Sequence, residues 1–329
     1  MKSLELLLDE EYDESKISSI LDEIENKHCL IPRLEADEEY LKIEAELLGQ
    51  LLHHDDIIEK AQKFAKNKAL KEINRQTYQA MEALVHNLNT MHSRAGAQIP
   101  FSSINYGTDT SPEGRIVIKN LLLAAEAGLG NGETPIFPIH IFKIKEGVNY
   151  FSDDPNYDLF RLACRVSAKR LFPNFSFLDA PYNLKYYKPG HPETEIAYMG
   201  CRTRVVGNVH DPSQEVINGR GNLSFTTINL PRLALKHKND LPGFFEELDE
   251  KIALVVEQLL ERFEIQAKKK VKNFPFLMGQ HIWLDSDKLD HDDEIREVLK
   301  HGTLSMGFIG LAECLKALIQ QKVAAIAVK

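Results

Sequence analysis

The fold is indicated by PIFPIHIFKI at residues 135–144, a stretch that is apolar on both faces. Such a strand is typical of a parallel sheet that is covered on both sides. Before it, the apolar pattern predicts a helix over residues 116–127, ended by Gly128. After it, Asp154 is the expected N-cap of a helix that runs to about Arg170. The alternation of strand and helix predicts an α/β fold.

Short apolar runs separated by helical patterns continue on both sides of this unit. A long amphipathic helix is expected over residues 245–263, and a final helix is expected from about Leu311. The other strands are expected at residues 98–105, 175–179, 223–230 and 302–309, with strand or extended chain at 274–284 and a helix at 292–300. Repeated strand–helix units imply a mostly parallel sheet, open or closed into a barrel.

The first part of the chain has a different pattern. Residues 1–93 read as mainly helical, most clearly over Glu72–Met91, where apolar side chains recur at steps of three and four residues. The sequence therefore predicts two parts, a helical N-terminal segment at 1–93 and an α/β part at 94–329.

The composition excludes several classes of protein. Of the 329 residues 43% are hydrophobic, and the formal net charge is −9, which provides no electrostatic footprint for nucleic acid. There is no apolar run of about 18 residues and no secretory N-terminus, so a cytoplasmic protein without membrane contact is expected. The four cysteines lie far apart without a Cys-x-x-Cys pair, so neither a disulfide framework nor a metal site within this chain is expected.

Residues 180–221 interrupt the alternation with about forty residues that show little helix or strand signal. A loop of this length inside a compact domain is usually functional or disordered, and its tyrosines and valines favour an ordered one. Cys201 lies near its middle, between Gly200 and Arg202. Arginine can stabilise a thiolate or bind an anion, but a free cysteine is more often a small buried apolar residue. Local chemistry leaves both interpretations open.

Several motifs in combination resemble the catalytic subunit of the anaerobic, class III, ribonucleoside-triphosphate reductases. The resemblance covers about residues 70–318, and the motifs occur in the family's order. They are NLNTMHSRAGAQIPFSSIN at 87–105, ETPIFP at 133–138, MGCR at 199–202, and GRGN at 219–222 leading to INLPR at 228–232.

The resemblance implies a fold and a chemistry. It implies part of a ten-stranded α/β barrel of the glycyl radical enzyme type, preceded by a helical segment, with residues 180–221 as the loop threaded into its centre. It also implies that Cys201 receives a radical from a glycine and, as a thiyl radical, removes the 3′ hydrogen of a ribonucleoside triphosphate. Loss of the 2′ hydroxyl as water follows, with formate as the reductant, so that deoxyribonucleoside triphosphates are made for DNA synthesis.

The resemblance further implies a set of site residues. Asn222 occupies the position at which oxygen-dependent relatives carry a second redox cysteine, and it is the second expected catalytic residue. Ser102 and Asn105 are expected to bind ribose hydroxyls or phosphate, and an ordinary buried hydrogen bond is the alternative for these residues. Substrate contacts are also expected from the residues beside Cys201, although the last two of them could instead position the loop tip; they are Met199, Arg202 and Thr203.

The sequence departs from the family pattern in what it lacks. We find no N-terminal nucleotide-binding cone for ATP and dNTP effectors, no four-cysteine zinc site and no radical glycine. A truncated subunit that is inactive alone is therefore expected, and the resemblance implies that the zinc belongs to the missing C-terminal part. The resemblance implies a radical-SAM iron–sulfur activating enzyme and a second copy of the chain as partners of the intact enzyme. The alternatives are an inactive fragment, an interaction module that binds the intact reductase, and a related glycyl radical enzyme, although the lone Cys201 disfavours the last.

Overall fold

The computed structural model describes residues 14–34, 38–50, 55–92, 98–200 and 203–319. The chain divides into two compact units, each described here by itself. The first contains the described residues of 1–180 and 198–202, and the second contains those of 181–197 and 203–329. The predicted boundary near residue 93 lies within the first unit.

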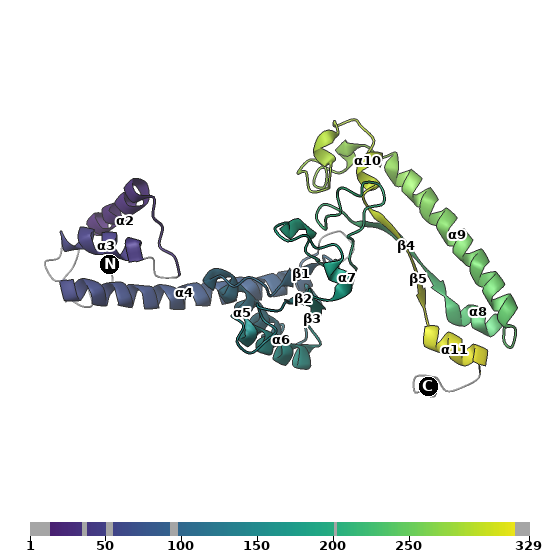
Figure 1. Ribbon diagram of the computed structural model, residues 1–329, viewed down its shortest axis with the longest axis horizontal. Helices are drawn as coiled ribbons and strands as arrows, with labels where there is room; N and C mark the ends of the chain where they lie inside the picture. The colour runs from purple at the N-terminus through teal and green to yellow at the C-terminus, as the bar shows by residue number, and fades with distance from the viewer. Residues whose placement is uncertain (1–13, 35–37, 51–54, 93–97, 201–202, 320–329) are drawn as a thin grey trace. The chain divides into compact units, whose positions relative to one another are not determined.

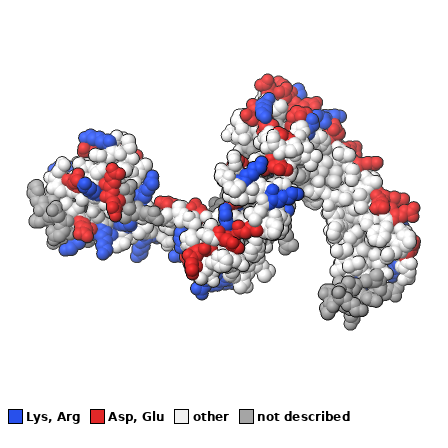
Figure 2. All heavy atoms as spheres, in the orientation of Figure 1, with Lys and Arg blue, Asp and Glu red and all other residues white. Residues whose placement is uncertain are grey.

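Three helices open the first unit (Figure 1): α2 (Glu14–His28), α3 (Glu38–Gly49) and α4 (Asp55–Thr90). Their shared core is small and apolar, and consists of Ile20, Ile24, Tyr40, Leu48, Ile58 and Ala61. The helical character predicted for the start of the chain is confirmed for its described residues. Lys, Arg, Asp and Glu side chains are interspersed on the visible face of these helices (Figure 2), as on an ordinary solvated surface.

The first unit then forms a parallel sheet. Its strands are β1 (Ser103–Tyr106), β2 (Ile139–Ile144) and β3 (Asn174–Phe177), in that order across the sheet. Helices α5 (Pro112–Ala127) and α6 (Tyr157–Arg170) connect successive strands. The predicted strand–helix alternation and parallel pairing are confirmed here, and β2 is the buried central strand.

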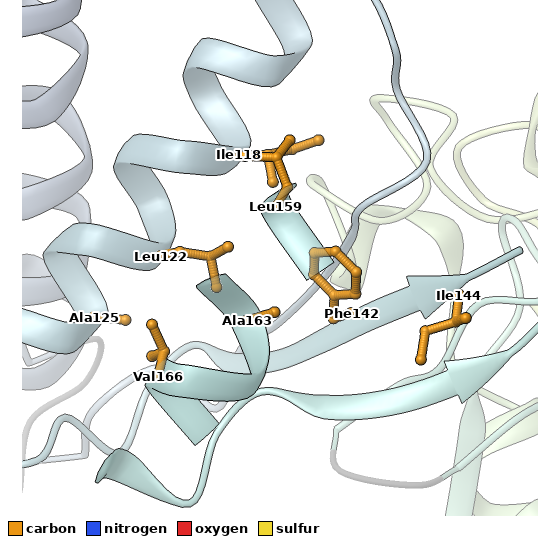
Figure 3. Packing of buried hydrophobic residues seen from close by; sticks show 8 residues of the cluster. All are labelled: Ile118, Leu122, Ala125, Phe142, Ile144, Leu159, Ala163 and Val166. Carbon is orange, nitrogen blue, oxygen red and sulfur yellow. The ribbon is translucent and has the colours of Figure 1, made fainter. Parts of the chain in front are cut away.

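Helices α5 and α6 cover one face of β2 (Figure 3), where Phe142 and Ile144 meet side chains of both helices. Phe142 is fully buried, and its ring lies 5.6 Å from that of Tyr106 and 6.1 Å from that of Phe175. Alternate residues of a strand point to opposite faces. Ile139 and Ile141 therefore belong to a second cluster on the other face of the sheet.

The helix ends follow local chemistry, with one correction. Gly128 follows the end of α5 with a φ of 85°, as predicted for a glycine stop. Asp154, however, does not cap α6, because its carboxylate accepts hydrogen bonds from the backbone N–H groups of Tyr150 and Phe151, each at 2.8 Å. The residue before the helix is Asn156, whose amide is used in other contacts.

The second unit contains a pair of parallel strands, β4 (Asn222–Asn229) and β5 (Thr303–Ile309). Along the sequence, the long helix α9 (Leu241–Ala267) comes between the two strands, and α11 (Leu311–Ile319) follows β5. Both helices were predicted. Figure 2 shows a largely uncharged surface where Figure 1 draws β4 and β5, and acidic side chains along α9. The shorter elements are α7 (Pro181–Leu184), α8 (Leu230–Lys236), α10 (Arg296–Leu299) and the 3-10 turns η1 (Pro192–Thr194), η2 (Val271–Asn273) and η3 (Ser286–Lys288).

Some expectations for this unit are wrong. Residues 274–284 form turns rather than a strand, and the helix predicted at 292–300 shortens to the single turn of α10. Within the described residues the strands form separate parallel sheets of three and two strands, so a ten-stranded barrel is not what these residues form by themselves. Among the helices described, none is long and apolar enough to cross a membrane.

Candidate functional site

The end of the loop's first half, Tyr198–Gly200, belongs to the first unit and lies along β1. The side-chain amide of Asn105 donates to the carbonyl oxygen of Tyr198 at 2.8 Å and accepts from the N–H of the same residue at 2.9 Å. Asn105 therefore pairs with this segment as a neighbouring strand's backbone would. Tyr198 also packs against the apolar cluster around Ile139 and Ile141.

A second bond fixes the following residues. The Ser103 hydroxyl accepts a hydrogen bond from the N–H of Gly200 at 3.1 Å. Because Asn105 meets Tyr198 and Ser103 meets Gly200, the segment runs antiparallel to β1. Cys201 is the next residue, and it lies with Arg202 outside the described residues.

The backbone conformation at position 200 requires a glycine. Its φ is +57°, in the region that L side chains rarely adopt. A Cβ at this position would lie 3.0 Å from Cε1 of Phe101, whose ring makes an edge contact with Phe137 at 5.1 Å. The glycine before Cys201 therefore allows the chain both to turn and to approach β1 closely.

Ser102 and Asn105, paired in the sequence prediction, have different environments. The Ser102 hydroxyl lies 3.3 Å from the carbonyl oxygen of Pro100, and its own carbonyl accepts the N–H of Ile139 at 2.9 Å. Residues three apart on an extended chain point to opposite faces, whereas residues two apart share one. Ser103, which the sequence reasoning missed, is thus the serine that shares a face with Asn105. The alternation rule pairs Ser103 with Asn105 on one face, but it does not say which face meets the loop.

In the second unit, Asn222 is the first residue of β4 and is exposed. Its side-chain amide lies 3.1 Å from the hydroxyl of Ser305 on β5. Thr203, the first described residue after the gap, is also exposed. Of the other residues predicted to bind substrate, Met199 is half-buried between the bonded residues Tyr198 and Gly200.

The end of the loop's second half is held by Arg220, which is only 7% exposed. Its guanidinium donates to the carbonyl oxygens of Val206 at 2.6 Å, Gly207 at 2.8 Å, Val216 at 3.1 Å and His301 at 2.8 Å. Burial lowers the pKa of Arg220, yet arginine stays protonated at neutral pH. One side chain thus ties three loop carbonyls to the segment before β5.

His301 strengthens this attachment. Its Nε2 lies 3.2 Å from a carboxylate oxygen of Asp285, and its Nδ1 lies 2.9 Å from Nδ2 of Asn208 in the loop. Both ring nitrogens are therefore occupied. A histidine in this arrangement connects elements and has no free nitrogen for a metal or a substrate.

Behind β1, on the helix-covered face, Tyr106 and His140 form a buried polar pair with Oη and Nδ1 3.1 Å apart. Burial raises the pKa of Tyr106 and lowers the pKa of His140 to about 4. Both groups are therefore neutral near pH 7. Among the residues that the structure describes, Nε2 of His140 has no hydrogen-bond partner.

The described residues contain no group of three or more His, Cys, Asp or Glu side chains that could hold a metal ion. Cys29 and Cys164 are exposed and Cys314 is buried. Burial raises the pKa of the Cys164 and Cys314 thiols, which disfavours the reactive thiolate. Cys164 and Cys314 are therefore unlike the thiol of a catalytic site.

Elsewhere in the first unit a cavity of about 650 Å³ opens beside α2, α3 and α4. Its lining is mainly apolar, with Arg33, Glu44 and Lys66 among the charged residues. None of the predicted site residues that the structure describes contributes to it.

Comparison with known proteins identifies the family to which this chain belongs. The sequence pattern of the family described as anaerobic ribonucleoside-triphosphate reductase matches residues 52–327. The chain belongs to this family. The motif that contains Cys201, the strand residues Ser103 and Asn105, and Asn222 all fall inside the matched range, whereas α2 and α3 precede it.

Individual relatives agree with this assignment. The anaerobic ribonucleoside-triphosphate reductase of Escherichia coli K12 is 32% identical over 261 residues, which are 78% of this chain and 35% of the relative. That of Enterobacteria phage T4 is 33% identical over 267 residues, which are 78% of this chain and 43% of the relative. The chain thus spans between about a third and two fifths of the length of these relatives.

A crystal structure of the anaerobic ribonucleotide reductase from Thermotoga maritima, with citrate in the active site, is also similar. Its TM-score is 0.44 at 14% sequence identity, and the match covers 84% of this chain and 50% of that one.

Proposed function

We propose that this chain carries part of the catalytic centre of an anaerobic ribonucleotide reductase, which reduces ribonucleoside triphosphates to deoxyribonucleoside triphosphates. The observation that carries the proposal is the family match over residues 52–327, which includes the Met-Gly-Cys-Arg motif. The ordered attachment of Tyr198 and Gly200 to β1 supports it, because radical chemistry requires a fixed thiol.

Cys201 is the proposed catalytic thiol. Once its sulfur carries the radical, it takes the hydrogen atom from C3′ of the ribose, so that an S–H bond forms while a C–H bond breaks. The 2′ hydroxyl then takes up a proton and leaves as water, and after reduction Cys201 returns its hydrogen atom to C3′, which restores the thiyl radical. Formate is the proposed reductant, and its oxidation to carbon dioxide supplies the two electrons that the product requires.

Asn222 is the proposed second catalytic residue. Its exposed amide can donate to and accept from ribose hydroxyls, while Ser305 fixes its orientation from the neighbouring strand. Arg202 is proposed to bind substrate phosphate, since a guanidinium matches its geometry. Met199 and Thr203 are proposed to complete the surroundings of the substrate, whereas Ser102 is not proposed as a ligand, because it points to the opposite face from Asn105 and its hydroxyl bonds to the Pro100 carbonyl oxygen.

The proposed assembly needs partners. The radical is proposed to originate on a glycyl residue generated by a radical-SAM iron–sulfur enzyme, with a second copy of the chain in the active enzyme and ATP and dNTP as effectors. A zinc site does not fit the described residues, because they contain no cluster of metal-binding side chains. No zinc-dependent step is therefore assigned to this chain.

The sheets β1–β2–β3 and β4–β5 are proposed as parts of one ten-stranded barrel. Both are parallel, and the loop that contains Cys201 connects them along the chain. Among the described residues each sheet ends at strands that have a strand neighbour on one side, and a sheet edge can accept a further strand.

The test is an anaerobic assay with formate and a ribonucleoside triphosphate that carries deuterium at C3′. The chain is supplied alone, and with the activating enzyme and the remaining part of the Escherichia coli reductase. Deoxynucleotide should form only in the complete mixture, more slowly with the deuterated substrate, and not with Cys201→Ser. Binding to the intact reductase without turnover in any mixture would instead support an interaction module.

A further inference from the structure

Asn105 makes a two-point contact that few side chains could replace. Its amide both donates to and accepts from the backbone of Tyr198, at 2.8 and 2.9 Å. Aspartate has nearly the same shape but cannot donate, so it would place a carboxylate oxygen against the Tyr198 carbonyl. Glutamine would move the amide outward by one methylene. The contact is therefore specific to asparagine at this position.

Ser103 supplies the second anchor at a matching spacing. Ser103 and Asn105 are two residues apart on β1, and their partners Gly200 and Tyr198 are also two residues apart. An extended chain advances about 3.3 Å per residue, so both pairs of anchors are separated by about 6.6 Å. A slip of the segment by one residue would break both contacts at once.

The anchors are partly buried. Tyr198 packs against a cluster that includes Phe137, Ile139 and Ile141, and hydrogen bonds in such surroundings are stronger than exposed ones. Gly200 makes the last anchoring bond before Cys201.

We propose that Ser103 and Asn105 are positioning residues that fix the register of the segment leading to Cys201, rather than ligands of the substrate. This rests on the proposed function only in that Cys201 is the reacting thiol. The hydrogen bonds to Tyr198 and Gly200, two residues apart, fix the alignment of this segment with β1, so that Cys201 is always the residue after the last anchor. They thereby hold the backbone of Tyr198–Gly200, the last described residues before Cys201, in one alignment with β1.

Hydrogen exchange of the Tyr198 and Gly200 amides in the full chain tests the proposal. Ser103→Ala should speed exchange at Gly200 by about fivefold, and Asn105→Asp should speed exchange at both residues by about tenfold, because each variant removes or inverts a bond. Ser103→Thr keeps a hydroxyl and should restore most of the protection. Ser102→Ala is the matched control, and it should leave both amides unchanged.

Exchange of the β2 and β3 amides shows whether each variant remains folded. Unchanged protection at Tyr198 and Gly200 in both folded variants would overturn the proposal. In the complete reductase mixture, positioning variants should lower kcat and leave KM within about twofold, whereas loss of a substrate ligand would raise KM. A KM increase with constant kcat would also overturn it. The exchange result holds even if that mixture shows no turnover, which would count against the proposed function alone.

Discussion

Replacement of Gly200 by alanine should loosen the segment before Cys201 by a predictable amount. Gly200 has a φ of +57°, and an L residue in that region costs about 1–2 kcal/mol relative to its preferred conformations. The new Cβ would also lie 3.0 Å from Cε1 of Phe101. That ring is 71% exposed and can rotate away, so the steric contribution should be the smaller one. Alanine also restricts the open segment, which lowers the entropy lost on closing and offsets part of this cost.

The expected net cost is about 1–2 kcal/mol, so the segment should open about 5–30 times more often. Hydrogen exchange at Tyr198 and residue 200, measured under conditions in which reclosing outpaces exchange, reports this opening directly. Gly200→Asn should cost less than Gly200→Ala, because asparagine tolerates a positive φ while its Cβ meets the same ring. The difference between the two variants isolates the backbone contribution.

Gly207→Ala in the same loop is the matched control, since Gly207 does not have a positive φ and the nearest atoms to its added Cβ are 3.9 and 4.0 Å away. It should leave the Tyr198 amide unchanged. Equal exchange in Gly200→Ala and the unchanged chain, or a larger effect of asparagine than of alanine, would refute the reasoning.

Three further predictions concern the supporting structure. Burial lowers the pKa of His140 from 6.5 to about 4. The neutral His140 therefore stabilises the folded state by at most about 3 kcal/mol above pH 6.5, and this stabilisation is lost as the pH falls toward 4. Urea melts of His140→Gln should lack this part of the pH dependence of stability, whereas melts of the exposed His92→Gln should retain it. Arg220→Met leaves four carbonyls without their donor and should destabilise the β4–β5 amides in hydrogen exchange by about 3 kcal/mol or more, and a loss below about 1 kcal/mol would argue against a role in holding the loop. Phe142→Ala should destabilise the first unit in urea by about 3–5 kcal/mol, since Phe142 is fully buried, while Phe177→Ala, at a side chain that is 49% exposed, should cost much less.

The sequence predicted the elements that depend on local pattern. The apolar run at 135–144 contains β2, the glycine at 128 ends α5, and the final strand and helix begin within a residue of their expected positions. It failed where a side chain had a competing partner. Asp154 has the residue type of an N-cap, but nearby backbone N–H groups use its carboxylate instead. The apolar residues at 274–284 form turns, because apolar content alone does not distinguish a strand from a packed loop.

The candidate site was predictable only in part. The motif around Cys201 and the position of Asn222 could be read from the chain, since motif order and spacing are properties of the sequence. Ser103, Ser305 and Arg220 were not identified, because their partners lie 97, 83 and up to 81 residues away. Contacts over such separations depend on how the loop is attached to the strands.

By itself the sequence determined that this is an α/β protein with helices at its start, and that a single cysteine lies in a long loop with family motifs on both sides. These properties follow from periodicity, turn chemistry and motif order. Only the tertiary structure decided that Ser103 rather than Ser102 faces the loop, that Asn105 bonds to Tyr198, and that Arg220 ties the loop to the segment before β5. The physical reason is that a strand alternates its side chains between two faces, while the identity of the face that meets the loop is set by long-range packing.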